Sequence, residues 1–134
     1  MLRSEDIIAT LRMFQQENLD VRTVTLGIDL MDCSTPDIDQ LCAKVSRKIK
    51  KVAGRLVTVC EETGNKYGLP VVNKRIAVSP VSALAAGGRS EAYVRVAKAM
   101  DEAAAEVDID LVGGFSALVQ KGMTPSDRAL IDAI

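Results

Sequence analysis

Two carboxylates and a thiol follow the first alternating segment of the chain. Asp29 and Asp32 are three residues apart, and Cys33 comes directly after them. An Asp-x-x-Asp pair can hold a hard cation such as Mg²⁺ when water or substrate oxygens complete the shell, and a thiol near a cation can act as a nucleophile. The structural alternative is an Asx-type turn at Asp32 beside a buried Cys33. A ligand or metal site and a plain turn are both open.

A second polar group interrupts an otherwise apolar segment. The run from 71 to 78 contains Asn73, Lys74 and Arg75, and Ser79 follows it. Successive side chains of a strand point to opposite faces, so three polar residues in a row put polar groups on both faces. Burying them without partners is costly. Either this strand lies at a sheet edge, or these side chains line a polar cavity that would favour a small anionic ligand, a carboxylate or phosphate.

A pair of glycines marks the third candidate group. Gly113 and Gly114 end a short apolar run, and Phe115, Ser116 and Lys121 come after them. Glycine at such a place permits positive φ or the close approach of a ligand or another backbone. The spacing matches neither the dinucleotide-binding fingerprint nor the phosphate-binding loop. Packing and ligand binding are both compatible with this group.

The elements that must position these groups alternate along the chain. Helical spacing predicts helices over about 4–18, 36–66, 90–107 and from 125 onward, with a short helical stretch at 81–86, whereas strands are expected over 21–30, 71–78 and 109–112. This order predicts one α/β unit over 1–134, with about three core strands, at least partly parallel, and alternating helices. Ligands of open α/β sheets bind beyond the carboxyl ends of the strands. This rule selects the three polar groups, although Asn73, Lys74 and Arg75 lie within the second strand and only Ser79 follows it.

Two of these elements have informative patterns. The strand over 21–30 has one apolar face and one unusually polar face formed by Thr23, Thr25, Gly27 and Asp29. The helix over about 36–66 is expected to be one long amphipathic helix. Its predicted N-cap is Thr35, with Pro36 in the first turn, and Gly54 lies inside it.

Composition excludes several kinds of chemistry. The 134 residues contain no His, which removes Ser/His and Cys/His dyads and most zinc sites. Three cysteines without CxxC spacing do not make a disulfide framework and predict a reducing, cytoplasmic compartment. No apolar run approaches the length of about 20 residues that spans a membrane.

Charge gives little reason to expect a nucleic-acid partner. The net charge is −1, and the charged stripe of the long helix is typical of a solvated face rather than of a nucleic-acid site. The stripe consists of Lys44, Arg47, Lys48, Lys51 and Arg55. We therefore expect neither nucleic acid nor a membrane as partner.

Several segments resemble one group of prokaryotic proteins. These are Gly27–Cys33, Val72–Pro80 and Gly113–Gly122, with a similar opening stretch over 17–25. They resemble the N-terminal part of the uncharacterised "PFL family", a group of unknown function. The resemblance implies a barrel like that of pyruvate formate-lyase, and, because family members are several times longer, a chain that is the N-terminal part of such a barrel. The unfinished last helix and the small sheet agree with that expectation.

The resemblance carries almost no chemistry. Glycyl-radical enzymes need an Arg-Val-x-Gly-type motif, and the run Arg95-Val96-Ala97-Lys98 lacks the glycine. The family resemblance therefore implies no radical catalysis here.

Two functions are compatible with the sequence. The first is a cytosolic binding protein for a small anionic molecule, with an enzyme of unknown reaction left open. Lys74 and Arg75 would take the anion, Asp29 and Asp32 would orient the ligand or a cation, and the Gly113-Gly114 turn would close over it. The alternative is a non-catalytic regulatory or assembly module that acts through helix or strand-edge interfaces. A homo-oligomer is compatible with either.

Overall fold

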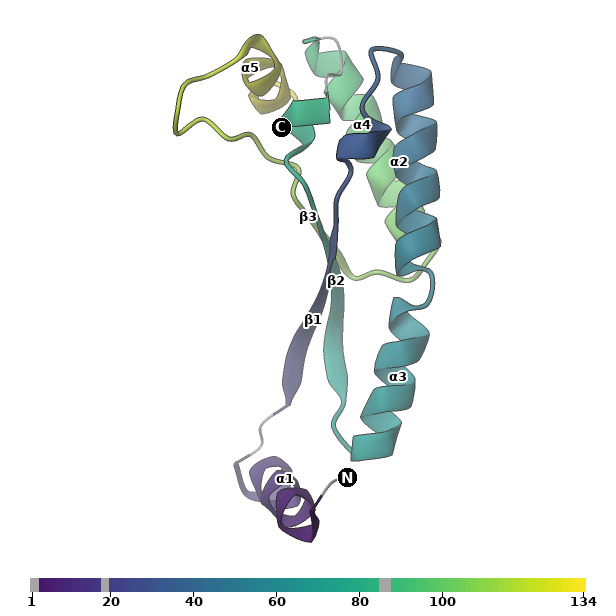
Figure 1. The fold of residues 1–134 in the computed structure, drawn as a ribbon, viewed down its shortest axis with the longest axis vertical. Helices are drawn as coiled ribbons and strands as arrows, with labels where there is room; N and C mark the ends of the chain where they lie inside the picture. Colours follow the sequence, from purple (N-terminus) through teal and green to yellow (C-terminus); the bar gives the residue numbers. More distant parts are fainter. Residues whose placement is uncertain (1–2, 18–19, 85–87) are drawn as a thin grey trace.

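A three-stranded parallel sheet forms the centre of the computed structural model, which describes residues 3–17, 20–84 and 88–134 (Figure 1). β1 (Val21–Ile28) pairs with β2 (Val71–Val78), and β2 pairs with β3 (Leu111–Gly113). The α/β class with parallel strands is confirmed. The sheet is open in the described part of the chain, so barrel closure is not shown.

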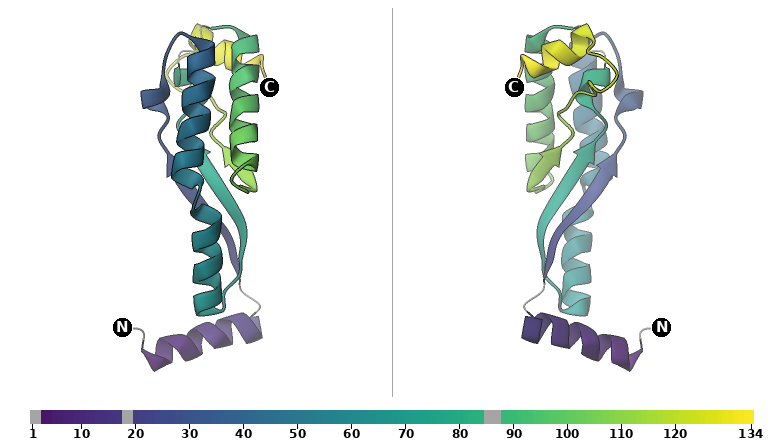
Figure 2. Two further views of the ribbon diagram at one scale, coloured as in Figure 1. Left: turned by 90° about the vertical axis from the view of Figure 1, so that its right-hand side faces the viewer. Right: turned by 90° about the vertical axis from the view of Figure 1, so that its left-hand side faces the viewer.

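Three helices cover one face of this sheet. They are α2 (Ile38–Ala53), α3 (Leu56–Tyr67) and α4 (Ser90–Ala105). The left panel of Figure 2 shows them in front of the strands, and the right panel shows the strands in front of them. α1 (Ser4–Glu17) lies across the far end, and α5 (Pro125–Ile131) lies near the carboxyl ends of the strands.

The prediction of one helix over about 36–66 is wrong, because the chain breaks between α2 and α3 at Gly54 and Arg55. The backbone N–H of Gly54 still donates to the Lys50 carbonyl, and a Cβ at Gly54 would lie 2.6 Å from that oxygen. Thr35 is not the N-cap either. Asp37 holds that position, because its carboxylate accepts hydrogen bonds from the backbone N–H groups of Asp39 and Gln40.

Other boundaries differ by a few residues. β2 has the predicted bounds, whereas β1 ends at Ile28 and β3 begins at Leu111. Short 3₁₀ helices occupy η1 (Met31–Cys33) and η2 (Val81–Leu84), so the short helical stretch expected over 81–86 is observed in its first part, and residues 85–87 lie outside the described ranges. The helix start at Thr124-Pro125 is confirmed, with a capping box between Thr124 and Asp127.

The core lies between α2, α4 and the covered face of the sheet. Its fully buried members are aliphatic apart from one tyrosine, whose hydroxyl donates to the Ser82 carbonyl at 3.1 Å. They include Leu30, Leu41, Val45, Ile49, Ile76, Val81, Leu84, Tyr93, Val96 and Leu130. Burial of this apolar surface holds the helices on that face.

The opposite face of the sheet has no helix against it among the described residues (Figure 2). The predicted alternation of β1 is confirmed, because Ile28 is buried whereas Thr25 and Gly27 are exposed. We call this second surface the bare face. None of the helices in the described ranges is long and apolar enough to cross a membrane.

Candidate functional site

The register of the sheet places two rows of residues across the bare face. Thr25 of β1 is paired with Arg75 of β2, and Arg75 is paired with Leu111 of β3. Since paired residues of parallel strands project to the same face, these three side chains form one row. The next row is Gly27, Ala77 and Gly113, so the bare face combines a cationic centre with a strip that has no side chain larger than methyl.

Arg75 is the central residue of the row that it forms with Thr25 and Leu111. Its Nε atom is buried and has no hydrogen-bond partner among the described residues. A buried donor without an acceptor costs about 1–3 kcal/mol. The guanidinium of Arg75 therefore has unused donor capacity on a face without a helix.

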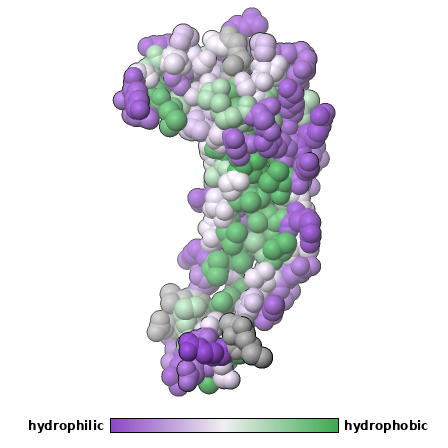
Figure 3. All heavy atoms as spheres, viewed as in Figure 1, coloured by the Kyte–Doolittle hydropathy of each residue, from purple (hydrophilic) through white to green (hydrophobic). Residues whose placement is uncertain are grey.

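The row of small residues leaves room beside Arg75. A Cβ at Gly27 would meet no heavy atom within 4 Å, and one at Gly113 would lie 3.7 Å from the Ile76 carbonyl oxygen. The face is hollowed as well. In Figure 3 the left-hand outline of the molecule curves inward between the segment before α5 and α1.

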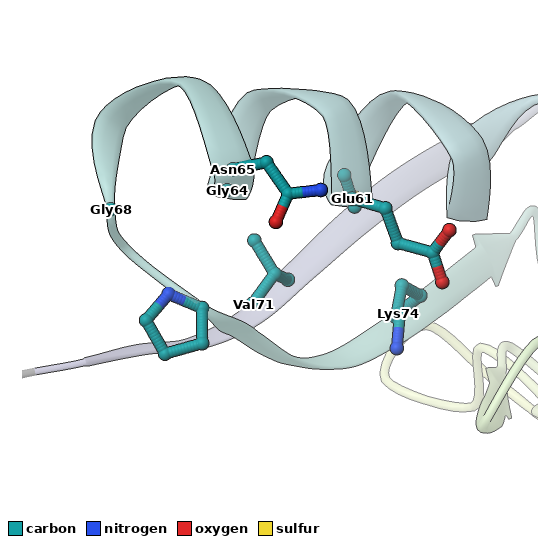
Figure 4. Close-up of a pocket in the computed structure, with 8 residues that line it drawn as sticks. Glu61, Gly64, Asn65, Gly68, Val71 and Lys74 are labelled. Atoms are coloured by element: carbon teal, nitrogen blue, oxygen red, sulfur yellow. The ribbon is translucent and has the colours of Figure 1, made fainter.

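Lys74 lies on the covered face, opposite Arg75. Its backbone N–H donates to the Asp110 carboxylate at 2.6 Å, and its carbonyl accepts from the Asp110 N–H at 3.0 Å. Its Nζ is 4.0 Å from the same carboxylate, and the side chain is 19% exposed. Lys74 lines a cleft of about 550 Å³ together with Glu61 and Asn65 of α3 (Figure 4). Lys74 and Arg75 therefore do not share a concavity.

Within the group of Asp29, Asp32 and Cys33, the two carboxylates have different hydrogen-bond partners. Asp29 Oδ1 accepts from the Met31 N–H at 2.9 Å, which is an Asx turn, and Asp32 Oδ1 accepts from Lys48 Nζ at 2.5 Å. The Lys48 hydrogen bond holds the pKa of Asp32 below its usual value. Burial raises the pKa of the Cys33 thiol, which keeps it neutral rather than nucleophilic.

The described residues contain no group of three or more acidic, cysteine or histidine side chains that could hold a metal ion. The carboxylate of Asp29 accepts the hydrogen bond of the Asx turn, and the carboxylate of Asp32 forms the ion pair with Lys48. The possible Mg²⁺ site therefore stays a prediction.

The segments after the strands are joined by hydrogen bonds. The Leu30 N–H donates to Ser79 Oγ at 2.8 Å, the Val81 N–H to the Gly114 carbonyl at 3.3 Å, and the Ser82 N–H to the Ser116 carbonyl at 3.2 Å. These bonds give Ser79 and Ser116 structural partners at the carboxyl end of the sheet.

Gly114 has a packing role. Its φ is +104°, and a Cβ there would lie 2.3 Å from the Val78 carbonyl oxygen. Phe115 packs partly buried against the core. Lys121 is exposed on the loop before α5, which projects on the side of the bare face (Figures 1 and 2).

Asn73 is exposed, and its Nδ2 donates to the Arg22 carbonyl at 3.0 Å. This hydrogen bond ties β2 to β1. Asn73 and Arg75 are candidate site residues from the sequence, whereas the row of Gly27 and Ala77 is not predicted by it. That row becomes visible only when the register of the three strands is known.

The architecture is that of an open, parallel α/β protein, with helices on one face of the sheet and none on the other face in the part of the chain that the structure describes. A family model described as "Uncharacterised ACR (DUF711)" matches residues 12–134, so the chain belongs to the DUF711 family. Relatives called "UPF0210 protein" are similar along the whole chain. That of Desulfovibrio desulfuricans is 54% identical, that of Syntrophobacter fumaroxidans 52%, and that of Oleidesulfovibrio alaskensis 50%. The chain spans 29% of the length of each.

Proposed function

We propose that the bare face binds a small molecule through a carboxylate group held by Arg75. The observation that carries the proposal is a guanidinium on the bare face that has no ion-pair partner among the described residues and whose buried Nε has no hydrogen-bond partner there. A guanidinium presents N–H donors in a planar fork that matches a carboxylate. A bound carboxylate would supply a negative partner for a guanidinium that forms no ion pair among the described residues.

The neighbours of Arg75 suit such a ligand. Thr25 contributes a hydroxyl in the same row, and Gly27, Ala77 and Gly113 leave space for the body of the molecule. A single arginine fits a singly charged group better than a multiply charged phosphate. Lys74 stays out of this proposal because it lies on the other face.

We further propose that the bare face is one sector of the inner wall of a barrel of the pyruvate formate-lyase kind. The relatives are more than three times as long as this chain, which leaves ample length for further strands. The row of Thr25, Arg75 and Leu111 would then line an interior cavity. The sequence resemblance and the polar side chains of Thr25 and Arg75 on the bare face support this arrangement.

The proposal is tested by calorimetric titration of the purified chain with acetate, malonate, succinate and inorganic phosphate. We expect a carboxylate to bind, Arg75→Met to abolish its binding, and Arg75→Lys to weaken it, because Lys lacks the planar fork. Gly27→Val should also block binding, since its side chain would occupy the small-residue row without meeting protein atoms. Lys74→Met is the matched control on the opposite face and should bind like the original chain.

Two results would contradict the proposal. One is equal carboxylate affinity in the original chain and Arg75→Met. The other is loss of binding in Lys74→Met with retention in Arg75→Met, which would move the site to the cleft beside α3.

An assembly role is the second candidate, and one observation favours it. A mainly apolar groove of about 440 Å³ lies between α4 and β3, lined in part by Met100, Ala104, Leu111 and Phe115. Leu111 is 51% exposed. Analytical ultracentrifugation of the chain and of Leu111→Lys tests whether this groove holds a second copy, in which case the substitution should shift dimers to monomers.

A further inference from the structure

A cleft on the helix side of the molecule combines four cations with one carboxylate. Lys44, Arg47, Lys48 and Lys51 lie at positions i, i+3, i+4 and i+7 of α2, which is the spacing of one helix face. The other wall comes from η1. The cleft has a volume of about 360 Å³ and is lined by these four residues with Asp32, Cys33 and Val52.

Three of the four cations have no acidic partner in the structure. Asp32 pairs with Lys48, whose Nζ lies 2.5 Å from its carboxylate. No ion pair joins Lys44, Arg47 or Lys51 to another side chain within the ranges 3–17, 20–84 and 88–134. The cleft therefore keeps a local excess of positive charge on a chain whose net charge is −1.

The arrangement of the cations indicates the charge of a ligand. Lys44 and Lys51 are seven residues apart, which is about 10 Å along a helix. One exposed ion pair contributes little, about 0–1 kcal/mol, so a singly charged ligand would gain little here. A ligand with several adjacent negative charges contacts several of these cations at once.

The remaining lining suits a small molecule rather than a nucleic acid. Val52 of α2 is 42% exposed and adds an apolar surface to the cleft, next to the buried Cys33 of η1. The residues that line the cleft include no aromatic side chain on which bases could stack. Figure 3 shows hydrophilic side chains gathered along the right-hand edge, over α2.

We propose that the cleft between η1 and α2 is a binding site for the diphosphate or triphosphate group of a small molecule. The phosphates contact Lys44, Arg47 and Lys51, and the exposed side chain of Val52 receives the uncharged part of the ligand. The cleft lies on the helix side of the sheet, away from Arg75, so it is separate from the carboxylate site of the bare face. Asp32 competes with the phosphates for Lys48.

The test is a calorimetric titration of the purified chain with inorganic pyrophosphate at low salt. The triple variant Lys44→Met, Arg47→Met and Lys51→Met is expected to bind about tenfold more weakly or worse, because the cations nearest the ligand are gone. The control variant Arg12→Met, Lys98→Met and Arg128→Met has the same change in net charge outside the cleft. It should keep the original affinity, as should Arg75→Met.

Asp32→Asn should change the affinity for pyrophosphate in the opposite direction. It removes the carboxylate from the cleft and frees Lys48, so pyrophosphate should bind several-fold more tightly. A merely structural role of Asp32 would weaken binding instead.

Four results would overturn the proposal. The first three are the absence of pyrophosphate binding to the original chain, an equal loss of affinity in the cleft and control triple variants, and binding of single-stranded RNA with no binding of pyrophosphate. The fourth is loss of pyrophosphate binding in Arg75→Met with retention in the cleft variant, which would place the phosphate site on the bare face. Circular dichroism of each variant shows whether it is folded.

Discussion

Lys74 and Arg75 are neighbours in the chain, yet β2 sends their side chains to opposite faces of the sheet. On the covered face, Lys74 is fixed by Asp110 and lies beside α3. On the bare face, the buried Nε of Arg75 has no hydrogen-bond acceptor within the ranges that the structure describes. The same strand therefore contributes to a packed core on one side and to a candidate binding surface on the other. Charge and residue type alone do not separate these two roles.

The two faces should differ most in how far the free energy of unfolding falls when a side chain is removed. Ile76 is fully buried on the covered face, so Ile76→Ala should lower the free energy of unfolding by about 4 kcal/mol. Thr25 is exposed on the bare face, and Thr25→Ala should change the free energy of unfolding by less than about 0.5 kcal/mol. Urea denaturation measures both values. Similar losses for the two variants would mean that the bare face is packed.

Gly113 ends β3 and Gly114 follows it, and these two glycines should differ in how well they tolerate a side chain. Gly114→Ala should destabilise the chain by about 2–3 kcal/mol, because alanine is strained at positive φ and its Cβ would collide with Val78. Gly113→Ala is the matched control, since its Cβ would make an ordinary contact at 3.7 Å. Thermal unfolding followed by circular dichroism compares them. Equal melting temperatures would refute the packing role of Gly114.

The carboxylate of Asp32 on the helix side should make stability depend on pH. Its pKa is lowered in the folded chain by the Lys48 hydrogen bond, so the stabilisation is present above the unfolded pKa of about 3.9. It is lost as the pH falls through the lower folded pKa. Asp32→Asn should therefore lose less stability than the original chain between about pH 5 and pH 2.

Asp29→Asn is the control for that experiment. Its recorded partner is the Met31 N–H, which an amide oxygen also accepts. Urea denaturation at a series of pH values measures how the free energy of unfolding changes with pH. The same pH dependence in Asp32→Asn and in the original chain would show that the Lys48 pair does not stabilise the folded chain.

Local patterns predicted the elements well. The alternation of β1 identified its two faces, and the bounds of β2 over 71–78 are as expected. The break at Gly54 was not predicted, because apolar spacing continues across it and one glycine is also tolerated inside helices. Asp37 was missed as N-cap because Thr35-Pro36 has the more familiar helix-start pattern.

The candidate site was less predictable. Alternation alone separates the side chains of Lys74 and Arg75, but it does not say which face the helices cover. The row of Gly27, Ala77 and Gly113 depends on the register of three strands that are distant in sequence. The cations of α2 have the spacing of a solvated face, and only the position of η1 makes a cleft beside them.

The most direct test of the difference between the two faces is a nuclear magnetic resonance titration of the isotope-labelled chain with the carboxylate that binds most tightly. We predict that the backbone amide signals of Thr25, Gly27, Arg75 and Ala77 shift together with one dissociation constant, whereas those of α3 stay in place. Shifts centred on α3 and Lys74, with the bare-face amides unchanged, would contradict the assignment of the site to Arg75.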